Sequence, residues 1–278
     1  MLPLAVPFIK NNGKVKLPYK QKNNFVVGWN VFCYVIDYKN HELRLAKKVD
    51  ENGKTNYFTV NDGDIFAFIG HNGAGKTTLI KSIVGVHDFD EGDILIDGIS
   101  TKDLTRENIH ELFVMVLQDT WLFNGTIMEN LRYGRLDATE DEVIDAAKLA
   151  HVHHFIQTLP DGYNMVLNEE ASNVSQGQKQ LLTIARAILA DPKILILDEA
   201  TSSVDTRTEI LIQKAMDNLM KGRTSFIIAH RLSTIKNADS ILVMKEGNII
   251  EQSTHDELLK KDGFYAGLYN AQFELGGE

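Results

Sequence analysis

The segment Gly70–Thr78 combines glycines with one lysine and two threonines at a spacing suited to holding phosphate. It reads Gly-His-Asn-Gly-Ala-Gly-Lys-Thr-Thr and matches the pattern G-x-x-x-x-G-K-[S/T], after an apolar run and before a helix-like stretch. Glycines let main-chain N–H groups turn toward phosphate oxygens, and a helix N-terminus adds positive potential. We expect Lys76 to reach the β- and γ-phosphates of a nucleotide and Thr77 to bind Mg²⁺. The other residues expected at the phosphates are Gly70, Asn72, Gly73, Ala74, Gly75 and Thr78.

Two adjacent carboxylates, Asp198 and Glu199, follow the apolar run Ile194–Leu197. Ligand sites in parallel sheets lie at the carboxyl ends of strands, so Asp198 is placed to hold Mg²⁺ through water. Glu199 points elsewhere and can polarise an attacking water as general base. Alone, such a pair is often a solvated strand end. Together with Gly70–Thr78 it predicts a site that hydrolyses a nucleotide.

The strands that must position these residues follow from apolar patterning. Unbroken apolar runs that alternate with helices are typical of a parallel sheet covered on both faces. Such runs are Ile65–Ile69, Lys193–Leu197, Ser225–Ala229 and Ile241–Met244. Upstream, short aromatic and branched runs predict a small antiparallel sheet, and residues 1–24 are expected to form an arm or loop. The short runs are Val31–Ile36, Glu42–Leu45 and Tyr57–Val60.

Three capping boxes, each a Ser or Thr followed three residues later by Glu or Gln, predict where helices begin. They are Thr139–Glu142, Ser175–Gln178 and Thr254–Glu257. The second begins a helix with one apolar face. This helix should stop at Asp191-Pro192, because a proline disfavours the helical conformation of the residue before it.

Composition limits the possible functions. The chain has 29 Lys and Arg against 38 Asp and Glu, a formal charge of −9, which disfavours unaided binding to nucleic acid or anionic lipid. The single cysteine, Cys33, excludes an internal disulfide framework and fits a reducing compartment. No apolar run approaches the roughly 20 residues that span a bilayer, and residues 1–9 are a poor signal peptide. We expect a cytoplasmic protein that reaches a membrane, if at all, through a partner.

Further motifs complete a pattern that resembles the ATP-binding cassettes of ABC ATPases. Asn173–Gln178 resembles the signature motif, Gln118 within Met115–Asp119 the Q-loop, Ser202–Asp205 the D-loop and His230 the switch histidine. All of them occur in the order of that family, and the resemblance runs from around Asp62 to Phe273.

The resemblance implies an α/β fold of the phosphate-loop NTPase (RecA-like) type. This fold has a parallel core, an N-terminal antiparallel β subdomain and an inserted α-helical subdomain. Within one ABC ATPase domain, 1–278, the implied parts are the arm and β subdomain (1–62), the nucleotide-binding core (63–118 and 192–278) and the helical subdomain (119–191).

The resemblance also implies ATP and Mg²⁺ as cofactors and two cassettes that enclose two nucleotides. Ser175, Gly177 and Gln178 of one cassette would face the γ-phosphate held by the other, homo- or heterodimeric, partner. The implied catalytic residues are Glu199, His230 and Gln118, and the implied metal-site residues are Thr77, Gln118 and Asp198. The expected partners are a second cassette and the transmembrane domains of a transporter, and nucleic acid is not expected.

Two features depart from the family pattern. Val174 replaces the usual Leu, and Gln176 the usual first Gly, of the signature motif; similar variants resemble exporter-type members. An aromatic that stacks on adenine is expected a little over two dozen residues before the phosphate loop, and none sits at that spacing. Tyr38 is the nearest candidate, followed by Tyr34.

The two halves of the chain resemble different branches of the family. Residues 58–98 resemble stand-alone ATP-binding subunits of efflux systems, whereas residues 104–274 resemble the nucleotide-binding domain of exporters. We therefore hypothesise a hybrid cassette, or an excised domain with a foreign N-terminal half. Trp121–Phe123, after the Q-loop, has two interpretations of equal weight: a docking patch for the membrane domains, or ordinary packing.

Four functions compete. A transport ATPase subunit is the first of them. An ABC protein that maintains or repairs DNA is disfavoured, because it would carry long coiled coils between Gly70–Thr78 and Ser175. A ribosome-associated ABC factor is disfavoured, because it would carry two cassettes. A catalytically quiet dimerisation module is disfavoured by the intact Lys76, Asp198, Glu199 and His230.

Overall fold

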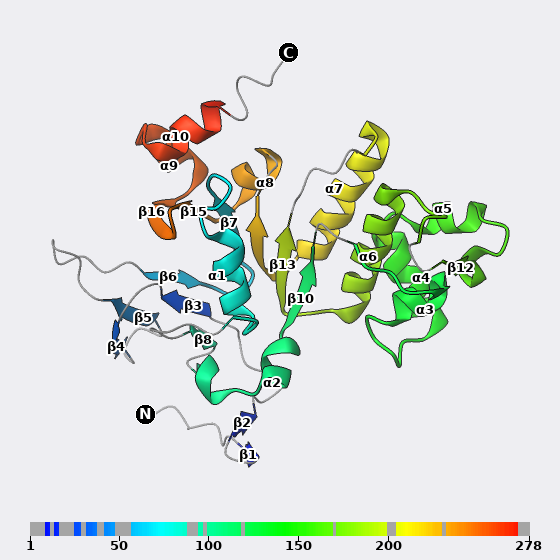
Figure 1. Ribbon diagram of the computed structural model, residues 1–278, viewed down its shortest axis with the longest axis horizontal. Coiled ribbons are helices and arrows are strands. Elements are labelled where there is room, and N and C mark those ends of the chain that lie inside the picture. Colours follow the sequence, from blue (N-terminus) through cyan, green and yellow to red (C-terminus); the bar gives the residue numbers. More distant parts are fainter. Residues whose placement is uncertain are drawn as a thin grey trace. The chain divides into compact units, whose positions relative to one another are not determined.

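The computed structural model forms two compact units, residues 1–113 with 236–278, and residues 114–235 (Figure 1). Side chains are described for residues 60–87, 94–96, 99–117, 120–168, 171–198, 204–229 and 234–271. Several strands before residue 60, and residues 232–233, are described by their backbone alone. Within these segments, no helix is both long and apolar enough to cross a bilayer.

The first unit contains part of the parallel core. Strand β7 (Ile65–Ile69) pairs in parallel with β15 (Ser240–Lys245), and β15 turns back into the antiparallel β16 (Asn248–Ser253). The turn places Glu246 at φ 50° and Gly247 at φ 79°, the left-handed pair that two-residue hairpins prefer. The strands predicted at Ile65–Ile69 and Ile241–Met244 are confirmed here. Helix α1 (Lys76–Ile83) follows β7 after a six-residue loop, residues 70–75.

The same unit carries a β-rich part, as predicted. A four-stranded antiparallel sheet has the order β6-β3-β8-β9, and two hairpins, β1-β2 and β4-β5, precede or interrupt it. The strands are β1 (Ile9–Asn11), β2 (Lys14–Lys16), β3 (Phe25–Gly28), β4 (Phe32–Asp37), β5 (Glu42–Lys47), β6 (Tyr57–Val60), β8 (Ile94–Ile96) and β9 (Ile99–Ser100). The prediction of a plain arm or loop over residues 1–24 is wrong at β1 and β2, where alternation over only three residues is too short to detect.

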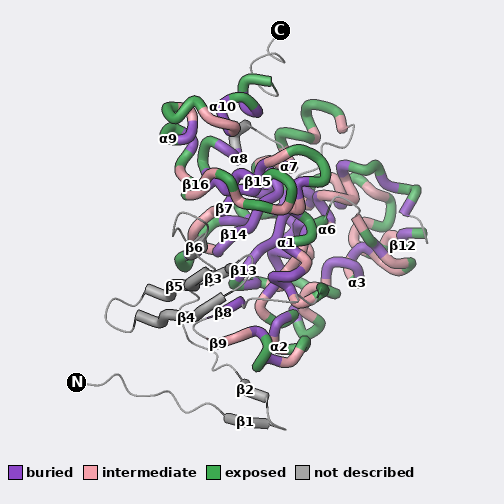
Figure 2. The backbone as a smooth tube through the Cα atoms, turned by 60° about the vertical axis from the view of Figure 1, so that its left-hand side comes forward, coloured by how far each residue is buried: buried purple, intermediate pink, exposed green. Residues whose placement is uncertain are grey.

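The second unit contains the rest of the core. Its strands lie in the order β10 (Phe113–Val116), β13 (Ile194–Asp198) and β14 (Thr224–Ile228), and β13 and β14 are parallel and in register. Nearly every residue of β13 and β14 is buried (Figure 2). This burial explains why the two sequences read as unbroken apolar runs.

The helices of the second unit surround α6 (Gln176–Ala190), which packs against α3 (Ile127–Arg132), α4 (Glu140–Leu149) and α7 (Thr206–Met220). A short helix α5 (His153–Thr158) and a two-residue ladder between β11 (Gly125–Thr126) and β12 (Val166–Leu167) complete this part. The apolar face of α6 is buried, and α6 ends at Ala190 with Asp191 as its C-cap before Pro192, so the predicted stop is confirmed.

Short helices lie elsewhere in the chain. They are α2 (Arg106–His110), α8 (Leu232–Asn237), α9 (His255–Lys260) and α10 (Phe264–Tyr269). The predicted capping boxes at Thr139 and Ser175 are confirmed, whereas the one at Thr254 is wrong. Thr254 does precede α9, but its side chain makes no capping hydrogen bond, and the Glu257 carboxylate accepts from the Ser253 hydroxyl.

Candidate functional site

The loop between β7 and α1 has the geometry of a phosphate cradle. Gly73 and Gly75 have φ angles of 80° and 98°, in the left-handed region that favours glycine. Gly75 is the N-cap residue of α1 and has no side chain to cap it, so N–H groups of the first turn remain for an outside acceptor. A helix N-terminus that follows a glycine-rich loop of this kind is suited to binding an anion.

The Lys76 side chain folds back over this loop. Its Nζ donates to the carbonyl oxygens of Gly70 at 2.6 Å and His71 at 3.1 Å, and the residue is only 7% exposed. The ammonium group is therefore held at the loop before any phosphate arrives. The next two residues, Thr77 and Thr78, are exposed at the start of α1.

The hairpin β15–β16 contacts the phosphate loop, residues 70–75. Gly247 N–H donates to the Ala74 carbonyl at 3.0 Å, and a Cβ at Gly70 would come closer than 3.0 Å to the Met244 carbonyl oxygen. The phosphate loop therefore depends on a turn more than 170 residues away in sequence, which the motif itself does not reveal.

The carboxyl ends of the core strands lead directly into the predicted catalytic residues. Strand β13 ends at Asp198, which is level with Ile228 of β14 and partly exposed. Three predicted residues follow within two positions of strand ends, but they lie outside the described residues, as does Tyr38. They are Gln118, Glu199 and His230. Their roles stay predictions.

The N-terminus of α6 is formed by the predicted signature motif. The Ser175 hydroxyl accepts from the Gln178 N–H at 3.3 Å, and the Gln178 side chain accepts from the Ser175 N–H at 2.8 Å. Ser175 and Gln176 are exposed, so this positive helix end is accessible to a ligand. Val174 is buried, and the replacement of leucine by valine therefore keeps an apolar side chain there.

Gly177 has a steric role that sequence reasoning missed. It is buried where α6 meets α7, and a Cβ at this position would lie less than 3.0 Å from the side chains of Thr208 and Val204. Asp205 fixes the start of α7 by accepting from the Thr208 N–H at 3.0 Å, and these hydrogen bonds hold the pKa of Asp205 below its ordinary value. The two helix N-termini thus pack closely because position 177 lacks a side chain.

Gly177→Ala should destabilise the protein by about 1–3 kcal/mol, the usual effect of overpacking a buried contact. Chemical denaturation followed by circular dichroism measures this change. Gly267→Ala is the matched control, since it lies in α10 with nothing within 4 Å of the added Cβ. This control should be neutral or slightly stabilising, because alanine favours helix. If the two variants had equal free energies of unfolding, α6 and α7 would accommodate the added Cβ at no cost, and the steric role of Gly177 would be wrong.

The residues of Trp121–Phe123 do not all fit one of the two interpretations, a docking patch or ordinary packing. Leu122 is buried and packs inside the unit, whereas Trp121 is 60% exposed. Trp121 contacts Phe123 and Tyr133, with ring centroids 5.8 and 6.0 Å apart, and Tyr133 is 56% exposed. Arg186 of α6 lies over the Trp121 and Tyr133 rings at 5.8 and 5.5 Å. The sequence did not reveal Tyr133 or Arg186 as members of this cluster.

The histidines near residue 150 do not form a metal centre. The His153 Nδ1 atom lies 2.8 Å from the Tyr163 hydroxyl, which satisfies it within the fold. Among the residues whose side chains are described, no group of three or more His, Cys, Asp or Glu is placed to hold a metal ion.

The family model for ABC transporters matches residues 54–202, more than half of the chain. The chain belongs to the ABC transporter family. It is an ABC-type ATP-binding domain with a phosphate-loop α/β fold, as the motifs predicted, and ATP-binding domains of this family are ATPases.

Three relatives place the domain within the family. It is 56% identical over 217 residues to the uncharacterized ABC transporter ATP-binding protein YfiC of Bacillus subtilis, a match that covers 78% of this chain and 36% of YfiC. It is 54% identical over 209 residues to the fatty acid ABC transporter ATP-binding/permease protein of Mycobacterium bovis, with coverages of 75% and 33%. A bacterial Atm1-family ABC exporter with ATP bound superposes with a TM-score of 0.79 and 34% identity, over 99% of this chain and 46% of the exporter.

The chain thus spans about a third of the length of these two curated relatives. The family match also runs across residues 100–104, where the halves of the hypothesised hybrid would join. The hybrid origin stays a prediction. Comparing residues 1–100 and 104–278 separately with other proteins tests it, and equal similarity of both parts to one natural family would contradict it.

Proposed function

We propose that this domain powers an ABC transporter by hydrolysing Mg-ATP between two cassettes. The observation that carries the proposal is the exposed, capped N-terminus of α6 at Ser175. Such a helix end attracts an anion, and the chain's own phosphate loop already begins another helix, α1. A nucleotide bound at Lys76 of one cassette would therefore be closed over by Ser175 of a second.

The remaining site residues follow from this arrangement. Backbone N–H groups of the loop, Lys76 and Thr78 would hold the phosphates, while Thr77, Asp198 and Gln118 would hold Mg²⁺. This set of hydroxyl, carboxylate and amide oxygens suits a hard cation that keeps several waters. Mg²⁺ would neutralise charge on the phosphates, and Glu199 would accept the proton of the attacking water.

Other contacts would complete the closed nucleotide site. His230 would donate to the γ-phosphate, and Gly177 and Gln178 would join Ser175 at the partner's nucleotide. Tyr38 remains our candidate for stacking on adenine. We place this activity at the cytoplasmic face of a membrane, in contact with transmembrane domains, because the relatives include proteins named as combined ATP-binding and permease proteins.

Ser175→Ala should impair ATP-driven dimerisation while leaving the ATP affinity of the monomer nearly unchanged. A hydrogen bond to a charged group contributes about 1.5–3 kcal/mol, so the dimer should weaken about 10–100-fold per site. Sedimentation of the Glu199→Gln protein with and without this substitution, over a series of concentrations in Mg-ATP, measures the effect.

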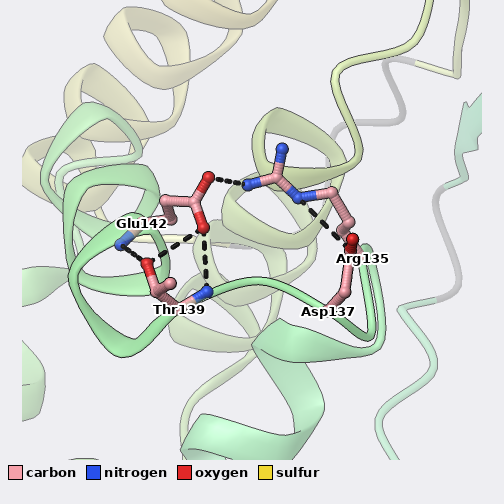
Figure 3. A network of polar contacts seen from close by, with 4 residues as sticks. All are labelled: Arg135, Asp137, Thr139 and Glu142. Atoms are coloured by element: carbon pink, nitrogen blue, oxygen red, sulfur yellow. Dashed lines mark hydrogen bonds and ion pairs between the residues drawn. The ribbon is translucent and has the colours of Figure 1, made fainter.

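Thr139→Ala is the control variant, because it removes a helix cap but leaves the proposed phosphate contact of Ser175 in place. Thr139 caps α4 through the same reciprocal pair of hydrogen bonds with Glu142, which Arg135 also contacts (Figure 3). Loss of either cap should cost about 1 kcal/mol of stability. If Ser175→Ala weakens the dimer no more than Thr139→Ala, the proposed contact across the dimer is wrong.

We propose that Trp121 and Tyr133 form a docking surface for the transmembrane domains. These two side chains contact each other and are 60 and 56% exposed, and an exposed apolar patch is typical of an interaction site. The patch belongs to the helical part, residues 119–191, that the sequence predicted as a separate subdomain. Exposed aromatic anchors next to an arginine are the composition that interfaces favour.

Trp121→Ala should lower the affinity for the membrane domains of the transporter by about tenfold or more, because truncating an aromatic anchor typically costs about 2 kcal/mol. Reconstitution with those domains, followed by pull-down at graded concentrations, measures this. Ile210→Ala removes an apolar side chain that is 52% exposed from α7 and should have no such effect. Equal losses in the two variants, or none in either, would exclude Trp121 as an anchor.

A further inference from the structure

Arg186 lies on the helix that begins with the signature motif, yet its side chain reaches another segment. Its Nε donates to the Asn130 carbonyl at 2.8 Å, its Nη2 to the Asn130 Oδ1 at 3.1 Å and its Nη1 to the Trp121 carbonyl at 3.0 Å. The guanidinium also lies over the rings of Trp121 and Tyr133. Burial lowers the pKa of Arg186, in keeping with a largely enclosed cation.

Asn130, the partner of Arg186, organises the loop that carries Trp121. It is fully buried, with 0% exposure. Its Oδ1 accepts from the Phe123 N–H at 3.0 Å, and its Nδ2 donates to the carbonyls of Phe123 at 2.9 Å and Thr126 at 3.1 Å. The guanidinium and the Phe123 N–H thus share one acceptor. Every polar atom of the Asn130 side chain is used to fix the loop and to join it to α6.

Two more contacts bind the same segments together. At the other end of α6, Gln176 Nε2 donates to the Thr120 hydroxyl at 3.4 Å, a long hydrogen bond. A Cβ at Gly134 would come closer than 3.0 Å to the Arg186 carbonyl oxygen, so the chain after α3 runs directly against α6. Residues 120 and 121 therefore contact α6 at Gln176 and at Arg186, two positions about 15 Å apart along the helix at 1.5 Å per residue.

We infer that Arg186 is a positioning residue that joins the docking surface to the signature helix, so that capture of a nucleotide at Ser175 is transmitted to Trp121. The inference rests on the proposed function. A planar fork with three bonds to fixed acceptors resists rotation, whereas a lysine at this place could make only point contacts. Because coupling is reciprocal, a partner that holds Trp121 would also bias α6.

Hydrogen exchange of the Phe123 amide tests this inference, because that N–H bonds to the oxygen that Arg186 also holds. The proteins compared are Glu199→Gln and Glu199→Gln/Arg186→Lys, each with and without Mg-ATP. In the first, Mg-ATP should slow exchange at Phe123 by about fivefold or more, the lower end of measured allosteric couplings. In the second, the slowing at Phe123 should disappear while the amides of 176–179 still become protected.

The difference in Phe123 exchange with and without Mg-ATP distinguishes transmission through Arg186 from a general loss of stability. A purely structural arginine would raise exchange at Phe123 with and without nucleotide and leave the slowing intact. Thr183→Ala is the control on the same helix, since the Thr183 hydroxyl bonds only within α6, to the Lys179 carbonyl at 3.0 Å. It should retain the full response. If Arg186→Lys does not fold, Arg186→Met keeps the packing of the stem and serves in the same comparison.

Two results would overturn the inference. Full slowing at Phe123 in the Arg186→Lys protein would exclude the transmission, as would a Phe123 amide that does not respond to Mg-ATP in a protein that dimerises. Sedimentation of the same samples reports the dimer. A Glu199→Gln protein that binds ATP and stays monomeric contradicts the proposed function itself, and the inference with it.

Discussion

Glu199→Gln should leave Mg-ATP binding intact and slow ATP hydrolysis by roughly 10²–10⁴-fold, the usual contribution of a general base. Glutamine keeps the size and hydrogen-bonding reach of glutamate but cannot accept a proton from water. The residue directly follows β13, whose last residue, Asp198, is fixed level with β14. Single-turnover hydrolysis at saturating Mg-ATP measures the effect.

The control for Glu199→Gln removes one carboxylate elsewhere. Glu140→Gln lies in the exposed first turn of α4 and should hydrolyse ATP at the parent rate. If the Glu199→Gln protein also turned over at the parent rate, Glu199 would not be the base. In that case Mg²⁺ and the phosphate contacts alone would have to activate the water.

Lys76→Ala should abolish nucleotide binding at ordinary ATP concentrations. The ammonium is buried and held by two carbonyl oxygens, so it reaches a phosphate without first being ordered. Hydrogen bonds to charged groups contribute about 1.5–3 kcal/mol each, and loss of contacts to two phosphates should weaken ATP binding about 10²–10⁴-fold. Equilibrium dialysis with labelled ATP measures the affinity.

Two further variants separate the role of Lys76 from charge and folding. Lys81→Ala removes one positive charge from the same helix, α1, and should change the affinity little. Lys76→Met keeps the apolar stem and should behave like Lys76→Ala while preserving the folded state by circular dichroism. Near-parental affinity in both Lys76 variants would mean that backbone N–H groups hold the phosphates without the lysine.

The features that sequence predicted well are local ones. The loop before Lys76 and the capping boxes at Thr139 and Ser175 each depend on residues within a few positions of one another, and all three take the predicted conformation. The parallel strands β7, β13, β14 and β15 were also predicted to within about two residues, because burial on both faces leaves unbroken apolar runs.

The features that sequence missed depend on distant partners. Strand β3 pairs with β8, nearly 70 residues later, and the bonds of Arg186 to Asn130 join residues 56 apart. No periodicity encodes such a contact, although an asparagine on the same helix face as Ile127 and Leu131 of α3 is a hint that a buried polar group needs partners. At Thr254 the local pattern was present, but the neighbouring Ser253 took the carboxylate.

The Gly177 contact shows a second reason for incomplete prediction. The signature motif suggested a role at the nucleotide, whereas the fold reveals that this glycine also lets α6 and α7 approach. A motif position can therefore be fixed by packing as well as by ligand binding. Only the structure, through the side chains of Thr208 and Val204, separates these two demands.

The central claim is that a nucleotide held by one cassette is closed over by the serine-capped helix of another. Size-exclusion chromatography of the Glu199→Gln protein, with and without Mg-ATP, tests it most directly. We expect a monomer without nucleotide and a dimer that retains two ATP molecules when Mg-ATP is present. A protein that binds ATP stoichiometrically and still elutes as a monomer at high concentration would contradict it.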